Sequence, residues 1–299
     1  MNVSEHIAVN VVMPAPAYAG HWDAIVSPPD RKDRLLHHAL LAWTVRGKIP
    51  FETSAVHGLA VLLGPPGTGK TTLARGLPYT ASQALHGRRA RLIEIHPHGL
   101  MSAEHGQTQQ AVSELLTEYL PDLVTDGIPT VVLLDEVESM AVARSAASLS
   151  ANPVDVHRAT DAVLTALDDL ARRAPHIFFV VTSNYPQGLD EAFLSRADVV
   201  LDIGLPDANA LARILSDTLN AWGKAFPGME QLAGADALAA TAQVLVGVDG
   251  RQARKLVAQA VAGRLQTALE PASLTAADLL DAARTLAATA EEVRELRAG

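Results

Sequence analysis

The stretch Gly64-Pro65-Pro66-Gly67-Thr68-Gly69-Lys70-Thr71 fits the pattern G-x-x-x-x-G-K-[ST] and stands between an apolar run and a helical pattern. Its glycines let backbone N–H groups converge on phosphate oxygens, and the start of a helix adds a favourable partial charge. The pattern therefore predicts a phosphate-binding loop for ATP. We expect Lys70 to reach the β and γ phosphates and the Thr71 hydroxyl to serve Mg²⁺, with Thr72 among the nucleotide-binding residues.

Short apolar runs, separated by amphipathic segments of helix length, recur on both sides of this loop. They are Leu59–Leu63, Arg91–Ile95, Val131–Leu134, Ile177–Val181 and Val199–Ile203. This alternation is typical of a parallel sheet whose two faces are covered by helices. We therefore predict an α/β fold with a parallel five-stranded sheet flanked by helices.

The pattern changes near residue 205, after which every segment reads as helix. These segments are Ala208–Trp222, Ala235–Val246, Arg251–Leu265 and a last helix from about Thr275. Before Trp22 the chain looks weakly structured, because it contains Pro14 and Pro16. We expect an N-terminal extension at residues 1–20, a large nucleotide-binding domain at 21–205 and a small helical lid domain at 206–299.

Composition narrows the class of protein. The formal net charge of -9 disfavours generic binding to a nucleic-acid backbone, which needs a basic surface. The chain has no Cys, which excludes disulfides, thiolate zinc sites and a cysteine nucleophile. No apolar run is long enough to span a bilayer, and the first residues lack the pattern of an export signal. We expect a cytoplasmic protein that contacts no membrane and no nucleic acid directly.

Two carboxylates, Asp135 and Glu136, follow the apolar run Val131–Leu134. The carboxyl ends of strands are where open α/β sheets place ligands. We expect Asp135 to hold Mg²⁺ through water and Glu136 to polarise the attacking water, two roles that suit neighbours pointing to different sides of a strand. Alone, such a strand end is a common helix-capping arrangement, but downstream of a phosphate loop it indicates catalysis.

Two further polar residues are candidates for catalysis. Asn184 closes the run that begins at Ile177, where its amide would orient the water or touch the γ phosphate, although an Asn at this place is often only a turn former. Arg196 stands just before the fifth run. We expect it to act as an arginine finger on a neighbouring subunit, the alternative being a salt bridge with Asp198 or Glu191.

The remaining candidates are weaker signals. Arg251, at a helix start in the C-terminal segment, is expected to reach the nucleotide, whereas Arg254 reads as a surface charge. Apolar groups near Ile25 and Val26 are expected to line the base pocket. One histidine cluster lacks the spacing and the carboxylates of a zinc site and reads as solvated loop residues. It consists of His96, His98 and His105.

Several stretches together resemble the pachytene-checkpoint and thyroid-receptor-interacting AAA+ ATPases over roughly residues 20–265. They are Trp22–Val26, Leu134–Ser139, Ala162–Asp168, Thr182–Asn184, Ala192–Asp198 and Gly250–Leu256. The resemblance implies a homo-hexameric ring that uses ATP and Mg²⁺ to convert a HORMA-domain protein from a closed to an open form, by engaging a chain segment in its central pore. It also implies the residue roles. These are Lys70 as Walker lysine, Asp135 and Glu136 as Walker B pair, Asn184 as sensor 1, Arg196 as finger and Arg251 as sensor 2.

The chain departs from the eukaryotic members in two places. Only about 20 residues precede Trp22, where those members carry a large N-terminal domain that docks substrate. In the first pore loop Glu104 and His105 replace adjacent aromatics, which leaves Leu100 and Met101 as the apolar grips. The short form resembles bacterial members that accompany HORMA proteins and cyclic-oligonucleotide synthases in antiviral operons, where the ATPase would switch off signalling.

Two other functions are compatible with the same motifs. A nucleic-acid-associated AAA+ loader would need a basic groove and an ATPase that DNA stimulates, and the acidic charge balance weakens this interpretation. A nucleotide-dependent assembly switch would bind partners through its ring without performing work on them. Turnover measured with and without a HORMA partner separates these functions from remodelling.

Overall fold

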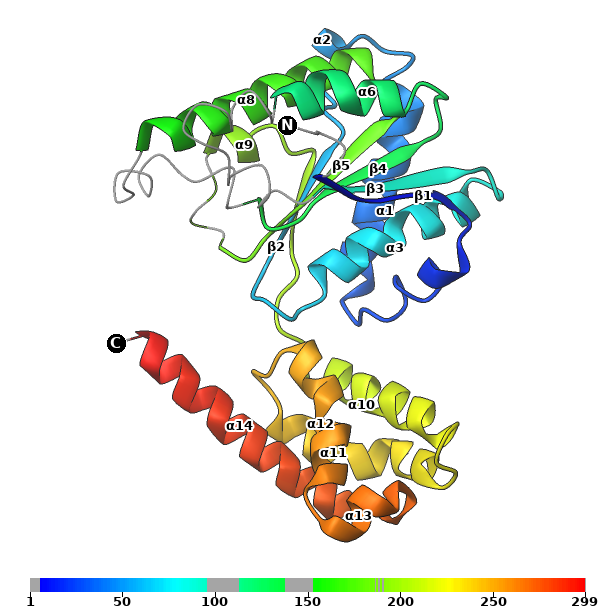
Figure 1. The fold of residues 1–299 in the computed structure, drawn as a ribbon, viewed down its shortest axis with the longest axis vertical. Coiled ribbons are helices and arrows are strands. Elements are labelled where there is room, and N and C mark those ends of the chain that lie inside the picture. The colour runs from blue at the N-terminus through cyan, green and yellow to red at the C-terminus, as the bar shows by residue number, and fades with distance from the viewer. Residues whose placement is uncertain are drawn as a thin grey trace. The chain divides into compact units, whose positions relative to one another are not determined.

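The computed structural model describes residues 6–95, 113–137, 153–185, 187, 189 and 191–298 (Figure 1). The chain divides into two compact units. The first contains residues 1–64 and 70–203, and the second contains residues 204–299 together with the short segment 65–69. Among the described residues, no helix is both long enough and apolar enough to cross a membrane.

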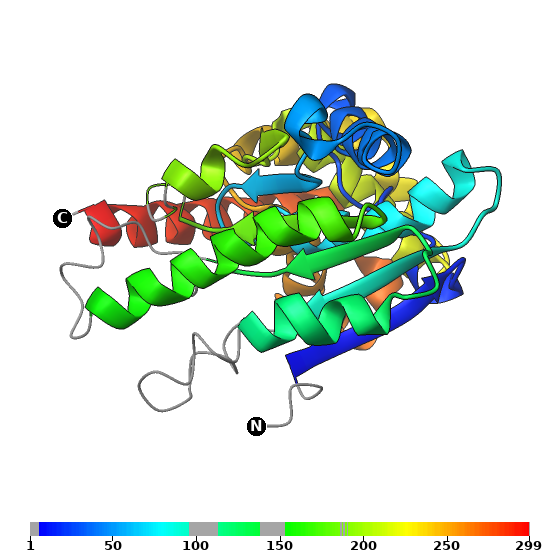
Figure 2. The ribbon, with the colours of Figure 1, turned by 90° about the horizontal axis from the view of Figure 1, so that it is seen from above.

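The first unit is built on a six-stranded sheet with the strand order β1-β3-β4-β5-β2-β6. The strands are β1 (Ile7–Met13), β2 (Leu59–Leu63), β3 (Ala90–Ile95), β4 (Thr130–Leu134), β5 (Ile177–Ser183) and β6 (Val199–Asp202). Strands β2 to β6 run parallel, and β1 runs antiparallel to β3 along the outer edge (Figure 2). All five apolar runs of the sequence are strands, so the α/β fold is confirmed.

The sheet is mixed, which corrects the prediction of five parallel strands. Its sixth strand, β1, lies in the segment expected to be a weakly structured extension. An edge strand pairs on one side only, and most side chains of β1 stay partly exposed, so the sequence lacks the buried apolar run that marks an inner strand. The nearby Pro14 and Pro16 lie after the strand and do not interrupt it.

Helices cover both faces of this sheet (Figure 1). Alternation along β4 sends Val132 and Leu134 to one face, and Val131 and Leu133 to the other. The first face packs against α8 (Pro153–Arg173), α6 (Leu120–Leu123), α9 (Glu191–Leu194) and the π-helical turn η3 (Leu115–Tyr119). The second face packs against α1 (Pro29–Val45) and α3 (Lys70–Ala84). The core is therefore two apolar layers separated by the sheet. Two short elements, η2 (Pro16–Tyr18) and α2 (Phe51–Ser54), lie in the connections.

The second unit is helical from residue 208 onward. Its elements are α10 (Ala208–Gly223), η6 (Met229–Ala233), α11 (Ala235–Val244), α12 (Gly250–Ala262), α13 (Leu265–Leu269), η7 (Pro271–Ser273) and α14 (Ala276–Ala298). Carboxylates cap two helix starts, since Asp207 accepts from Ala210 N and Asp249 accepts from the N–H groups of Arg251 and Gln252. The prediction of a single helix over Arg251–Leu265 is wrong about where that helix ends. Helix α12 stops at Ala262, before Gly263, and α13 follows as a separate helix.

Candidate active site

The phosphate loop begins directly after β2 and ends where α3 begins at Lys70. Gly64 has a positive φ of 143°, and a Cβ there would collide with the carbonyl oxygen of Ile203, so the position requires glycine. Lys70 is only 5% exposed. Its Nζ donates to the Gly64 carbonyl at 2.8 Å and to Asn184 Oδ1 at 2.8 Å. The buried ammonium therefore links the loop to the carboxyl end of β5.

The two predicted Mg²⁺ residues lie together. Thr71, in the first turn of α3, donates from Oγ1 to Asp135 Oδ1, just after β4, at 2.7 Å. A hydroxyl and a carboxylate are the hard oxygen donors that Mg²⁺ prefers in nucleotide sites. This donor set fits the metal that the phosphate loop implies.

Glu136 is held beside Asn184. The amide Nδ2 of Asn184 donates to Glu136 Oε1 at 3.2 Å, while its Oδ1 accepts from Lys70, so one side chain connects the Walker lysine to the candidate base. The backbone of Glu136 has a φ of 55°, a left-handed conformation that costs about 1–3 kcal/mol for a residue other than glycine. Such conformations persist where the surroundings hold them, and they cluster at active sites.

An ion pair whose carboxylate is buried was not anticipated from the sequence. Glu94 on β3 is fully buried, and its carboxylate accepts two hydrogen bonds from Arg75 on α3, at 2.8 Å from Nε and 2.6 Å from Nη2. The bond to Glu94 is the main cause that raises the pKa of Arg75, with a smaller contribution from the charge of Asp135. The signal was available, because a carboxylate inside the apolar run Arg91–Ile95 requires a cation close by.

Arg196 is engaged in a bidentate ion pair with Asp168 of α8. Its Nε and Nη2 each lie 2.8 Å from a carboxylate oxygen of Asp168, and its Nη1 donates to the Ala192 carbonyl at 2.8 Å. The pair lowers the pKa of Asp168, chiefly through the hydrogen bonds from Arg196. The Nε2 of His57 lies 3.5 Å from the same carboxylate.

The carboxylate that accepts from Arg196 in these bonds, Asp168, was not among the two considered from the sequence. The Asp198 carboxylate binds backbone groups: it accepts hydrogen bonds from the N–H groups of His57, Gly58 and Leu59 at 2.6–3.0 Å. Asp168 was missed because it lies 28 residues away in the chain, on a helix that packs on the same face of the sheet as the segment before Arg196. Only the packing of α8 against the sheet brings it next to Arg196.

Other predicted residues differ in their burial. Ile25 is buried in the apolar layer that contains α1, and Val26 beside it is half-buried. Thr72 is half-buried in α3. Arg251 is exposed at the start of α12, in the second unit. Further predicted residues lie outside the described residues: Leu100, Met101, Glu104 and His105 of the pore loop, and His96 and His98 of the histidine cluster.

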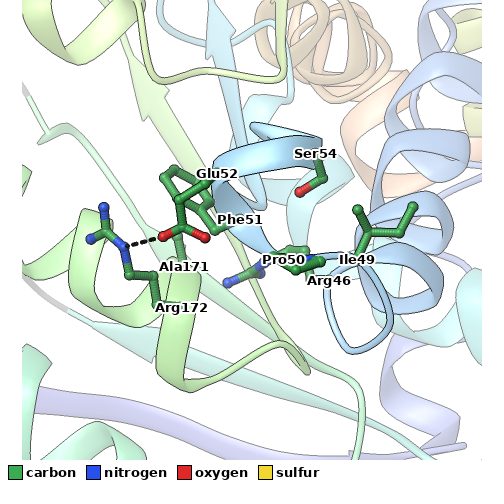
Figure 3. Close-up of a pocket in the computed structure, with 8 residues that line it drawn as sticks. All are labelled: Arg46, Ile49, Pro50, Phe51, Glu52, Ser54, Ala171 and Arg172. Carbon is green, nitrogen blue, oxygen red and sulfur yellow. Dashed lines mark hydrogen bonds and ion pairs between the residues drawn. The ribbon is translucent and has the colours of Figure 1, made fainter.

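A pocket of 230 Å³ lies at the opposite end of the sheet (Figure 3). It is lined by Arg46, Ile49, Pro50, Phe51, Glu52, Ser54, Ala171 and Arg172. Arg46 donates to the Leu170 carbonyl at 3.0 Å and to the carbonyl of Ile177, the first residue of β5. Burial lowers the pKa of Arg46 to about 10. None of the predicted catalytic residues lines this pocket, so it is separate from the carboxylates that follow β4.

Comparisons with known proteins give a family match and several relatives. Residues 60–205 match the model of the "ATPase family associated with various cellular activities (AAA)". The chain is 47% identical to "CD-NTase-associated protein 6" of Pseudomonas aeruginosa, over 88% of this chain and 86% of that protein. It is 35% identical to the "Pachytene checkpoint protein 2 homolog" of Arabidopsis thaliana over 68% of this chain, but spans only 44% of that protein's length.

Solved structures show the same fold. A chain of the "E. coli MS115-1 HORMA:CdnC:Trip13 complex" matches with a TM-score of 0.76 at 16% identity, covering 95% of this chain and 96% of that one. "C. elegans PCH-2" matches with a TM-score of 0.70 at 22% identity, covering 94% of this chain and 74% of that one. At these identities the likeness concerns the fold alone.

Proposed function

We propose, from the premise that this chain belongs to the AAA ATPases of the pachytene-checkpoint type, that it couples ATP hydrolysis to the opening of a HORMA-domain protein. The observation that carries the hydrolytic part is the hydrogen-bonded set in which Asn184 joins Lys70 to Glu136 while Thr71 joins Asp135. The names of two similar proteins support a HORMA-domain protein as the partner. The bacterial relative is called CD-NTase-associated, and one structural neighbour belongs to a HORMA complex.

Each residue of the set has a distinct task in hydrolysis. Lys70 binds the β and γ phosphates, and Thr71 and Asp135 would hold Mg²⁺, which neutralises charge on the phosphate oxygens when bound. Glu136 orients and polarises the attacking water. Asn184, in contact with both Lys70 and Glu136, keeps the water near the γ phosphate. These side chains bond to one another, which keeps them ordered and close to their working positions.

Arg196 is proposed to stabilise the transition state on a neighbouring subunit of a homo-hexamer. A guanidinium held by a carboxylate in a two-bond fork can exchange that carboxylate for a phosphate, because both anions present paired oxygens in similar geometry. The Arg196 side chain is 25% exposed, so it is accessible for such an exchange. Asp168 thus keeps the guanidinium extended and oriented until the neighbour supplies ATP.

The outer parts of the site are assigned on resemblance. We take residues 206–299 as the lid domain and residues 21–205, together with the edge strand β1, as the nucleotide-binding domain. Arg251 is taken as the lid's sensor for the phosphates, and Ile25 and Val26 as the wall of the base pocket. Leu100 and Met101 are proposed to grip the substrate chain in the central pore. In a bacterial antiviral system, opening the HORMA protein would end signalling by an associated cyclic-oligonucleotide synthase.

The test is ATP turnover together with partner release. The purified chain is assayed with a HORMA protein in its closed, peptide-bound form, and release of a fluorescent peptide is followed beside phosphate production. We expect ATP-dependent release that Glu136→Gln abolishes. Stimulation of turnover by DNA instead of the HORMA protein would favour a nucleic-acid loader. Binding of the HORMA protein in ATP without release would favour an assembly switch.

A further inference from the structure

Thr182 lies on β5, next to the two acidic residues of the active site that follow β4. It is the penultimate residue of that strand, and its side chain is 1% exposed. Parallel pairing of Leu134 with Val181 brings residue 182 alongside Asp135, one step beyond the end of β4. The position is therefore set by the register of two inner strands, which leaves the side chain little freedom.

The Thr182 hydroxyl is used by both acidic residues at once. It donates to Asp135 Oδ1 at 2.5 Å and accepts from the backbone N–H of Glu136 at 3.0 Å. A hydroxyl has a single proton, so its one donor is committed to the carboxylate that also accepts from Thr71. One buried side-chain oxygen thus orients the carboxylate proposed for Mg²⁺ and the peptide that carries the proposed base.

The bond to Glu136 matters because of that residue's backbone. The φ of Glu136 is 55°, so its backbone turns away from the direction of the strand. Its N–H, which would otherwise continue the hydrogen bonds of the strand, donates to the Thr182 hydroxyl. The same turn places the Glu136 carboxylate where it accepts from Asn184. Removing the acceptor breaks this part-buried hydrogen bond, so the turn loses a contact that holds it away from an ordinary strand conformation.

We propose that Thr182 is a positioning residue for ATP hydrolysis, which sets the orientation of the Asp135 carboxylate and the backbone turn at Glu136. Its described side-chain hydrogen bonds go to Asp135 and to the N–H of Glu136, and it acts through these two neighbours. The proposal rests on the proposed ATPase function. It adds a distinct requirement, namely a hydroxyl at position 182, which neither the Walker motifs nor Asn184 supplies.

The experiment compares three variants with the full-length wild-type chain. Thr182→Val removes the hydroxyl at nearly constant shape, and Thr182→Ser keeps it. Thr130→Val is the matched control, because Thr130 is a fully buried threonine at the other end of β4 whose hydroxyl bonds only the Ile128 carbonyl among the hydrogen bonds described for it. The readouts are kcat and KM for ATP, the Mg²⁺ dependence of binding of a fluorescent ATP analogue, and Tm without nucleotide.

We expect Thr182→Val to lower kcat by roughly 10- to 100-fold and to raise the Mg²⁺ concentration needed for half-maximal analogue binding, since loss of the group that orients a ligand has effects of that size. Thr182→Ser should restore both values, and Thr130→Val should leave both unchanged even if its Tm falls. If Thr182→Val fails to fold, the same comparison is made between Thr182→Ala and Thr182→Ser.

Two results would overturn the proposal: wild-type kcat and Mg²⁺ dependence in the variant without the hydroxyl, or an equal loss in Thr130→Val. A failure of the proposed function looks different. If the wild-type chain has no ATPase activity, that function is wrong, and the Mg²⁺ dependence of analogue binding still decides whether Thr182 orients Asp135.

Discussion

The two ends of the central sheet both carry buried or half-buried polar side chains, but these side chains have different kinds of partner. At the carboxyl end many of the contacts join two side chains, as in the contacts of Asn184 with Lys70 and Glu136. At the amino end the partners are backbone groups: Asp198 accepts from three consecutive N–H groups, and Arg46 donates to three carbonyls. Side chains can exchange partners by rotating, whereas a backbone partner moves only if the fold moves.

This difference separates an end of the sheet that can respond to a ligand from an end that holds the strands in register. A nucleotide can replace the mutual contacts of Lys70, Asn184 and Glu136 without disturbing any strand. No ligand can replace the contacts of Asp198 without releasing the start of β2. The pair of Arg196 with Asp168 is an exception near the amino end, because it joins two side chains and is therefore exchangeable.

The largest effect on turnover is expected for the pair of Arg196 with Asp168. Arg196→Ala should lower turnover by roughly 10³- to 10⁵-fold, the contribution usual for an arginine finger, while nucleotide affinity is retained. Mixing inactive Arg196→Ala subunits with inactive Glu136→Gln subunits should restore some phosphate release, because some interfaces then combine an intact finger with an intact site. No recovery at any mixing ratio, with mixed rings verified, would mean that Arg196 acts within its own subunit or only structurally.

The next largest effect on turnover is expected for the contacts of Glu136 and Lys70 at the carboxyl end of the sheet. Glu136→Gln should lower kcat by roughly 10²- to 10⁴-fold, the usual contribution of a general base, and should retain bound ATP. Lys70→Ala should instead lose nucleotide retention, because Lys70 acts on the phosphates already in the ground state. Equilibrium binding and single-turnover hydrolysis of ATP measure the two separately. Unchanged turnover in Glu136→Gln would remove Glu136 from the chemistry.

At the amino end the expected effect falls on stability alone. Asp198→Ala leaves the N–H groups of His57, Gly58 and Leu59 without their acceptor, and losing a hydrogen-bonded charge of this kind costs on the order of 1.5–3 kcal/mol. Urea unfolding should therefore show a lower free energy of unfolding, while ATP affinity of the folded protein stays at the wild-type value. A specific loss of ATP binding at wild-type stability would contradict the distinction between the two ends.

The smallest effect is expected for a surface pair at the same end. Glu52 and Arg172 line the pocket of Figure 3, lie 3.5 Å apart, and have side chains that are 70% and 51% exposed. Exposed ion pairs contribute about 0–1 kcal/mol, so Glu52→Gln should change the free energy of unfolding less than Asp198→Ala does. The two variants are compared in one set of urea titrations. A larger effect from Glu52 would contradict the expectation that backbone partners hold this end more strongly than an exposed pair of side chains does.

Much of the fold and of the site could be predicted from the sequence because the signals are local. Five apolar runs identified five strands, and the stretch from Gly64 to Thr71 predicted the connection from β2 into α3 by its own backbone requirements. The contact of Asn184 with Glu136 could be anticipated in outline, since parallel strands end at the same edge of the sheet. The roles of Arg196 and Arg251 remain predictions.

The sequence by itself determined the fold class, the phosphate loop and the order of polar residues at the strand ends, because glycine conformations, apolar periodicity and strand direction act over a few residues. Only the tertiary structure decided that β1 joins the sheet as an edge strand, that Asp168 holds Arg196, and that Thr182 bridges Asp135 to Glu136. These are contacts between segments far apart in the chain. Their partners are chosen by strand register and helix packing, which no short stretch of sequence encodes.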